Sequence, residues 1–174
     1  MTMKNIIEVQ NITKYFGDLT ALDDLSIKVC EGEIYGLLGS NGAGKSTTIN
    51  ILLGFLQPEK GKATINGIDA ITNSNQSRKC IGYIPENVSL YGYLSGVENL
   101  DYFCKLAGKS HNEDQLRDLL RESGLDDEAH KKRIKTYSKG MRQKVGIAIA
   151  LAKKAKVYLL DEPASGLDPL ASNE

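Results

Sequence analysis

The sequence predicts an α/β fold that carries an inserted helical segment. Apolar runs of strand length alternate with runs of helical periodicity, and a mostly polar stretch with helical spacing interrupts this alternation in the middle of the chain. The length of 174 residues is enough for one domain with a real core and a small insert. We therefore expect a single domain over residues 1–174, with a helical insert at residues 88–137.

Strand candidates dominate the first half of the chain. The runs IIEVQNI and LSIKV predict half-buried strands, and IYGLLG at residues 34–39 predicts a strand that is covered on both faces. The stretch KSTTINILLGFL that follows predicts an amphipathic helix. Asn66 and Gly67, placed between apolar residues, predict a two-residue hairpin, and KCIGYIPE predicts a further strand that ends at Pro85.

Helices dominate the second half. In the insert, SGVENLDYFCKLAG predicts a helix that Ser95 and Glu98 start with a capping box, and NEDQLRDLLRESG predicts a second helix with a leucine-rich face. The stretch SKGMRQKVGIAIALAKKA then predicts a long helix that begins at Ser138. After it, KVYLL predicts a buried strand that leads into Asp161 and Glu162.

Composition and charge exclude several classes of protein. Lysine and arginine (22) balance aspartate and glutamate (22), so no net field favours nucleic acid or an acidic membrane as a partner. No apolar run is long enough to span a bilayer, and the first residues do not resemble a signal peptide. Three widely spaced cysteines suit a reducing compartment. We expect a cytoplasmic protein that binds no nucleic acid.

The stretch GSNGAGKST at residues 39–47 fits the pattern G-x-x-x-x-G-K-[ST] of a phosphate-binding loop, or P-loop. Its glycines let backbone N–H groups approach phosphate oxygens, and the helix that begins at Lys45 directs its positive end at the same anion. Lys45 would bridge the β- and γ-phosphates, and the Ser46 hydroxyl would hold Mg²⁺. The alternative is a glycine-rich turn that binds nothing. The expected nucleotide-binding residues here are Gly39, Ser40, Asn41, Gly42, Ala43, Gly44, Lys45, Ser46 and Thr47.

Asp161 and Glu162 supply the acids that such a loop needs. Asp161 would hold Mg²⁺ through water, and Glu162 would polarise the water that attacks the γ-phosphate, which makes Glu162 and Lys45 the expected catalytic residues. An apolar run that ends in an acid is also typical of a strand followed by an acidic turn. Because a complete P-loop occurs in the same chain, we favour a nucleoside triphosphate and Mg²⁺ as cofactors.

Three stretches, LLGSNGAGKSTTINILLG, YSKGMRQKVGIAIAL and LLDEPASGLDP, occur in that order and closely resemble the ATP-binding cassette (ABC) ATPase of ABC transporters. The resemblance covers essentially the whole chain. It implies a P-loop NTPase sheet core with an N-terminal antiparallel β subdomain and an inserted α-helical subdomain. It also implies ATP-driven dimerisation with a second ABC ATPase subunit, which powers a separate membrane permease at the inner face of the membrane.

The middle stretch resembles the family's signature loop, which Ser138, Lys139, Gly140 and Met141 would form. In the family this loop receives a phosphate of the ATP that the opposite subunit holds. Independently of the resemblance, Ser138 can cap a long helix whose N-terminus attracts phosphate. Lys139 and Met141 depart from the commonest family residues, which are glycine and glutamine. The alternative is an amphipathic helix that only packs.

Three more positions take a role from the resemblance. Phe16 would stack on adenine, with Tyr15 as the second candidate and a core aromatic as the alternative. Glu86 stands where the family usually has a glutamine that touches Mg²⁺, and such a glutamate resembles the exporter subset. Asp168 would couple the two ATP sites of the dimer, unless SGLDP is a surface turn.

One expected element of the family has no counterpart. In the family a histidine that contacts the γ-phosphate follows these motifs, whereas His111 and His130 both precede the signature. We therefore expect a C-terminally truncated cassette with weak or absent hydrolysis, and the alternative function is a nucleotide-binding fragment without turnover. A soluble ABC ATPase of translation or DNA maintenance and a GTPase are less favoured. The run HKKRIK at residues 130–135 is interpreted as a solvated charged face.

Overall fold

The computed structural model describes residues 4–162. The chain divides into two compact units, residues 1–81 and residues 82–174. The first unit holds the P-loop, and the second holds the helical insert, the signature loop and the two acids.

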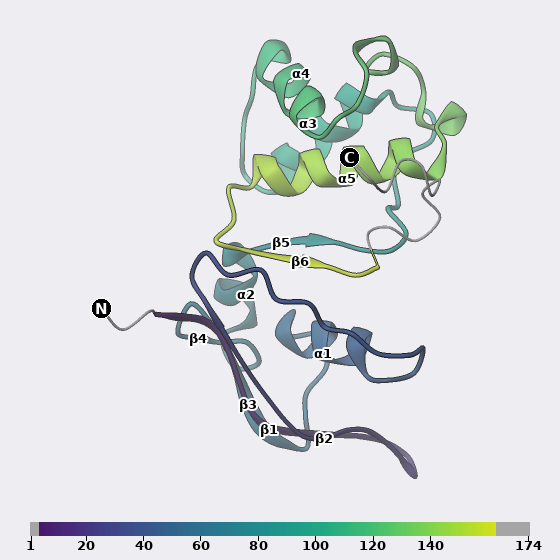
Figure 1. Ribbon diagram of the computed structural model, residues 1–174. Helices are drawn as coiled ribbons and strands as arrows, with labels where there is room; N and C mark the ends of the chain where they lie inside the picture. The colour runs from purple at the N-terminus through teal and green to yellow at the C-terminus, as the bar shows by residue number, and fades with distance from the viewer. Residues whose placement is uncertain (1–3, 163–174) are drawn as a thin grey trace. The chain divides into compact units, whose positions relative to one another are not determined.

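The first unit is built on a four-stranded antiparallel sheet with the strand order β2-β1-β3-β4 (Figure 1). The expected N-terminal antiparallel β subdomain is therefore present. Helix α1 follows the P-loop, and the short helices α2 and η1 follow β4. The bounds are β1 Asn5–Phe16, β2 Leu19–Cys30, α1 Lys45–Leu52, β3 Lys60–Ile65, β4 Ile68–Asp69, α2 Ser74–Ser77 and η1 Arg78–Cys80.

The apolar pattern of the sequence accounts for the core of this unit. Val9 and Ile12 on β1 and Ile65 on β3 are almost completely buried, and Ile51 on α1 is buried as well. The predicted hairpin between β3 and β4 is confirmed, because Asn66 and its neighbour Gly67 both have positive φ angles of 50° and 78°. These are the backbone conformations that a tight two-residue hairpin requires.

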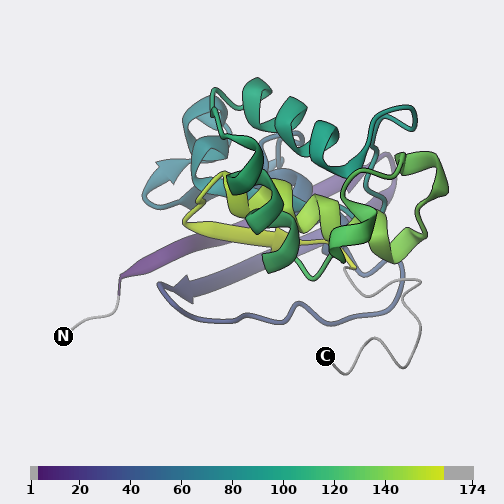
Figure 2. The ribbon, with the colours of Figure 1, turned by 90° about the horizontal axis from the view of Figure 1, so that it is seen from above.

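The prediction of a buried strand at residues 34–39 is wrong. Residues 33–40 form no strand, and the side chains of Ile34 and Leu38 are 99% and 93% exposed. Figure 2 shows this segment as an open trace that runs from β2 towards α1. An apolar run supplies strand propensity, but a strand forms only where neighbouring strands accept its hydrogen bonds. Neither of the two described sheets includes these residues.

The second unit combines three main helices with a pair of strands. Figure 1 shows α5 between the strand pair β5–β6 and the layer formed by α3 and α4. The bounds are β5 Ile81–Ile84, α3 Gly96–Leu106, α4 Glu113–Glu122, η2 Asp127–Ala129, η3 Ile134–Thr136, α5 Lys139–Ala152 and β6 Val157–Leu160. Strand β6 differs from the prediction, because Val157 and Leu159 are buried whereas Tyr158 and Leu160 are about half exposed.

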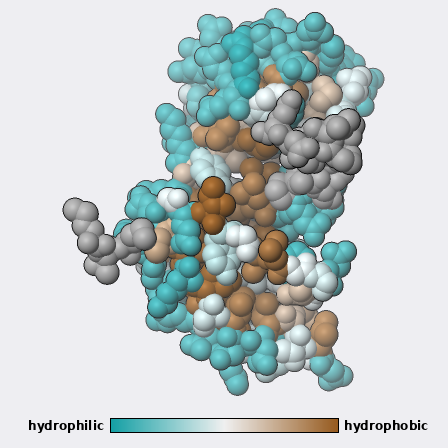
Figure 3. Space-filling model, in the orientation of Figure 1, coloured by the Kyte–Doolittle hydropathy of each residue, from teal (hydrophilic) through white to brown (hydrophobic). Residues whose placement is uncertain are grey.

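The three helices share one apolar core. Leu100 of α3, Leu120 of α4 and Val145 of α5 are fully buried in a common cluster. The predicted capping box is confirmed, because Ser95 accepts from the N–H of Glu98, and the Glu98 carboxylate accepts from the N–H of Ser95 at 2.7 Å. In the orientation of Figure 1 the outer surface of this helical layer is largely hydrophilic (Figure 3).

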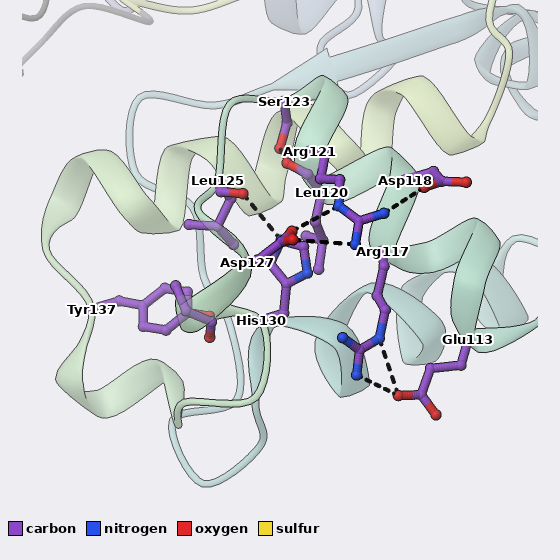
Figure 4. A network of polar contacts seen from close by, with 11 residues as sticks. Glu113, Arg117, Asp118, Leu120, Arg121, Ser123, Leu125, Asp127, His130 and Tyr137 are labelled. Carbon is purple, nitrogen blue, oxygen red and sulfur yellow. Dashed lines mark hydrogen bonds and ion pairs between the residues drawn. The ribbon is translucent and has the colours of Figure 1, made fainter.

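A polar network ties α4 to the chain that leads to the signature loop (Figure 4). Arg121 donates to Asp118 and Asp127 at 2.7 Å each, and the Nε2 of His130 lies 3.0 Å from the carbonyl oxygen of Leu125. His130 is fully buried, so the interpretation of residues 130–135 as a solvated face is wrong for this residue. The reason is tertiary packing, since the carbonyl oxygen of His130 accepts from the N–H of Val97, at the start of α3, at 3.1 Å.

No helix in the described residues 4–162 is both long enough and apolar enough to cross a membrane.

Candidate functional site

The P-loop leads directly into α1, as predicted. Gly42 and Gly44 have φ angles of 84° and 85°, which are left-handed backbone conformations that side chains disfavour. Helix α1 begins at Lys45, and its cap residue Gly44 carries no side chain that could satisfy the first N–H groups. The start of α1 therefore offers backbone donors and a positive helix end to an anion.

Gly44 is also required by its surroundings. A Cβ at this position would lie 2.6 Å from the carbonyl oxygen of Ala21 and 2.6 Å from Cδ2 of Leu22, both on β2. At Gly39, a Cβ would lie 2.9 Å from the Cβ of Ala43 within the loop itself. The loop is therefore packed against the antiparallel sheet at its end and folded tightly on itself at its start.

Lys45 lies across its own loop. Its Nζ donates to the carbonyl oxygens of Gly39 and Ser40 at 2.7 and 3.0 Å. The N–H of Ala43 also donates to the Ser40 carbonyl, at 3.1 Å. These two carbonyl oxygens hold the ammonium group at the loop, where a phosphate oxygen would form a stronger, charge-assisted bond with it.

Phe16 ends β1 next to the turn to β2, and its side chain is 47% exposed. The Nζ of Lys14 lies 5.4 Å from the ring centroid, and Lys14 also pairs with Glu59 at 2.8 Å. Hydrogen bonds from Lys14 and from the N–H of Tyr15 hold the pKa of Glu59 below its usual value. Tyr15 is exposed to a similar degree, so exposure alone does not separate the two candidates for adenine stacking.

In the second unit, Asp161 directly follows β6. Its N–H donates to the carbonyl oxygen of Ile84 at 3.0 Å, which extends the pairing with β5 by one residue. Burial raises the pKa of the Tyr83 phenol, and the neighbouring Asp161 carboxylate raises it further. Tyr83 is thus a neighbour of the expected metal ligand, and no motif in the sequence pointed to it. Glu162 has a φ angle of 48°.

Residues 138–141, which are expected to form the signature loop, lie at the start of α5, where the sequence predicts a helix. The Ser138 hydroxyl accepts from the N–H of Met141 at 3.2 Å, so Ser138 caps the helix. Lys139 is the first residue of α5, and its Nζ lies 3.7 Å from Oε1 of Glu86. The structure therefore brings together two residues at which the sequence departs from the family pattern.

A cavity of about 530 Å³ lies beside this ion pair, within the second unit. Its basic lining residues are Lys135, Lys139 and Arg142, and Ile134 and Gln143 contribute to its wall. A partly exposed tyrosine cluster lies close in sequence to the lining residues of this cavity and consists of Tyr91, Tyr93 and Tyr102. The ring centroid of Tyr91 lies 5.9 Å from that of Tyr93 and 4.9 Å from that of Tyr102.

The donor set fits Mg²⁺ in its chemistry. The hydroxyl of Ser46 and the carboxylates of Glu86 and Asp161 are hard oxygen ligands of the kind that this ion prefers. Within residues 4–162, no three acidic, histidine or cysteine side chains form a group that could hold a metal ion. Asp168, the remaining expected site residue, lies outside the described residues.

Comparison with known proteins identifies the family. Residues 22–165 match the family model described as ABC transporter. Over 172 residues the chain is 42% identical to an uncharacterized ABC transporter ATP-binding protein, YhcH of Bacillus subtilis, and 40% identical to the bacitracin transport ATP-binding protein BcrA of Bacillus licheniformis. Each match covers 99% of this chain and 56% of the relative, so the chain spans about half the length of these relatives.

Solved structures agree. An ATP-binding subunit of an ABC transporter superposes with a TM-score of 0.83 at 36% identity, covering 97% of this chain and 70% of that one. A dimeric bacterial ABC transporter cassette gives the same TM-score at 25% identity, covering 96% and 78%. The fold is therefore that of a P-loop NTPase, and the chain belongs to the ABC transporter ATP-binding family.

Proposed function

We propose that this chain binds Mg²⁺-ATP through its P-loop and, paired with a second cassette, hydrolyses it to drive a separate membrane permease. The start of α1 is the observation that carries the proposal. Left-handed Gly42 and Gly44 turn the loop so that α1 opens at Lys45, with a positive helix end and an ammonium group at the same place. Triphosphate binding is the function that this arrangement supports best.

The acids of the second unit would complete the chemistry. Asp161 and Ser46, with Glu86, would hold Mg²⁺, which when bound neutralises charge on the β- and γ-phosphates. Glu162 would orient and polarise the attacking water as general base. Phe16 would stack on the adenine, which its exposed ring permits.

The second cassette would be required because a signature loop acts in trans in this family. Ser138, Lys139, Gly140 and Met141 at the start of α5 would contact the γ-phosphate of the partner's ATP. Asp168 would link the two sites. The solved dimeric bacterial cassette supports this arrangement by its similarity.

The permease would contact the helical insert at residues 88–137. The tyrosine cluster and the neighbouring basic cavity support this, since tyrosine and arginine are enriched at protein interfaces and the rings are partly exposed. An exporter is favoured because relatives are named for bacitracin transport and linearmycin resistance. The chain would then work in the cytoplasm, against the inner face of the membrane.

The test is ATP binding and turnover by the purified chain, beside Lys45→Ala and Glu162→Gln. Binding that Lys45→Ala weakens about 10- to 100-fold, with turnover that Glu162→Gln abolishes, is the expected result. Binding without turnover would leave a nucleotide-binding cassette that does not hydrolyse by itself. An ATP affinity that Lys45→Ala leaves unchanged would contradict the proposal, because the P-loop would then not hold the phosphates.

A further inference from the structure

One face of α5 lies against the residues that follow β5. Lys139, Gln143 and Gly146 are spaced four and three residues apart, so they share one side of the helix. The Nε2 of Gln143 donates to the carbonyl oxygen of Pro85 at 3.2 Å. A Cβ at Gly146 would lie 2.8 Å from Cγ2 of Val88. The loop at residues 85–88 therefore contacts α5 at three points along this side of the helix.

Lys139 and Glu86 form the polar end of this contact. The Nζ of Lys139 lies 3.7 Å from Oε1 of Glu86, and the two side chains are 39% and 44% exposed. A cation at the first residue of a helix is repelled by the positive end of the helix dipole. The first turn of α5 contains no acid that could offset this repulsion. Glu86 supplies from another loop the negative charge that α5 itself does not provide.

The Glu86 carboxylate is therefore an anion paired with a lysine to which the proposed function assigns a phosphate. The γ-phosphate of the partner cassette's ATP would approach Ser138 and Lys139 at the start of the same helix. Both anions would use the ammonium group of Lys139. They have the same sign, so each disfavours the other at this position.

We propose that Glu86 is an internal competitor of the partner's γ-phosphate: it holds Lys139 in the lone chain and is displaced when the ATP-bound dimer closes. The inference rests on the proposed function, and it adds to that function a restraint on closure. Displacement also releases the Glu86 carboxylate for its expected place near Mg²⁺. Because residues 85–88 contact α5, loss of the ion pair would loosen one end of a loop that otherwise follows this helix.

The test is a double-mutant cycle with Glu86→Gln, Lys139→Gln and the double variant, all in a Glu162→Gln background that slows turnover. ATP-driven dimerisation is measured by analytical ultracentrifugation over a series of chain concentrations. We expect Glu86→Gln to tighten the dimer about two- to fivefold, which is the range of an exposed ion pair, and to have no such effect once Lys139 is Gln. The Lys144→Gln change on the same helix is the matched control, for which the effect of Glu86→Gln should persist.

If Glu86→Gln changes the dimer equally with and without Lys139, the carboxylate does not compete for that lysine and the inference is overturned. Urea unfolding of the nucleotide-free chain gives an independent readout, with a coupling of about two- to fivefold in the unfolding equilibrium constant expected for the same cycle. If that coupling is absent, Glu86 and Lys139 do not form an ion pair in solution and the inference is overturned. If the coupling is present but no variant forms an ATP-driven dimer, the proposed function is overturned, and the proposed competition with it.

Discussion

The four longest helices within residues 4–162 begin in two different ways. Helices α3 and α4 start with capping boxes and carry acids in their first turns, Glu98 in one and Glu113 with Asp114 in the other. Helices α1 and α5 carry no acid there, and each begins with a lysine, Lys45 or Lys139. Acids at a helix start neutralise the dipole, whereas a lysine adds to the positive potential. The starts of α3 and α4 are thus neutralised by their own acids, whereas the starts of α1 and α5 attract an anion from elsewhere.

Helices α1 and α5 also differ from each other. Lys45 contacts carbonyl oxygens of its own loop, and the cap of α1 is a glycine. Lys139 contacts the carboxylate of Glu86, and the cap of α5 is Ser138. A phosphate at Lys139 has to displace the Glu86 carboxylate, which is a charged partner. Together with the in-trans role proposed for the start of α5, the comparison predicts that α1 binds an anion in the lone chain and that α5 does so only in the dimer.

The largest effect is expected from a substitution at Gly44, because it prevents α1 from starting in its present conformation. Gly44→Ala should destabilise the chain by about 2–4 kcal/mol, because positive φ strain is joined by contacts of the new Cβ with Ala21 and Leu22 at 2.6 Å. The matched control is Gly42→Ala, which has the same kind of φ angle and open space around it, so about 1 kcal/mol is expected. Urea unfolding measures both, and equal losses would contradict the packing argument.

The next largest effect is a difference between Lys45 and Lys139 in their contribution to ATP affinity. Lys45→Ala should weaken ATP binding about 10- to 100-fold, since charge-assisted bonds to phosphate are each worth about 1.5–3 kcal/mol. Lys139→Ala should change it less than about twofold in the lone chain, because its phosphate would come from the partner. Titration with a fluorescent ATP analogue at low chain concentration checks this. Similar losses for both lysines would break the distinction between α1 and α5.

A smaller effect is expected from the cap of α5. Ser138→Ala should cost about 1 kcal/mol, because the hydroxyl satisfies the N–H of Met141. Ser138→Asp keeps an acceptor and adds a negative charge at the helix start, so stability should be preserved or raised while ATP-driven dimerisation falls. Thermal unfolding and ultracentrifugation measure the two properties. If Ser138→Asp raises or lowers both stability and ATP-driven dimerisation in the same direction, Ser138 does not lie where the partner's phosphate would bind.

The smallest effect concerns pH. Hydrogen bonds from the Ser95 N–H and then the Ser95 hydroxyl hold the pKa of Glu98 below its ordinary value of 4.5. A depressed carboxyl pKa stabilises the folded chain above that ordinary value, and this contribution is lost as the pH falls through the lower folded pKa. Glu98→Gln should therefore flatten the pH dependence of stability below pH 4.5. An unchanged slope in urea unfolding would mean that the capping box does not discriminate the charged form.

Local signals in the sequence predicted much of this molecule. The Asn66-Gly67 hairpin, the capping box of α3, the Ser138 cap and the start of α1 at Lys45 are all present. Each of these features depends on residues only a few positions apart, so propensity and hydrogen bonding within one turn decide it.

Features that depend on distant parts of the chain could not be predicted in the same way. The apolar run at residues 34–39 predicts a strand, but a strand forms only beside neighbouring strands, and no local pattern reveals where these lie. The burial of His130 and the contact of Lys139 with Glu86 likewise follow from tertiary packing. Tyr83 beside Asp161 has no signal in a single sequence.

The tyrosine cluster has a spectroscopic consequence. The sequence contains eight tyrosines and no tryptophan, so the intrinsic fluorescence of the chain is tyrosine emission. The rings of Tyr91, Tyr93 and Tyr102 are close enough to exchange excitation energy, and the hydroxyl of Tyr91 donates to that of Tyr102 at 3.2 Å. A single tryptophan introduced by Tyr93→Trp would collect that energy. Its emission would then report on any partner that covers the cluster, without a covalent dye.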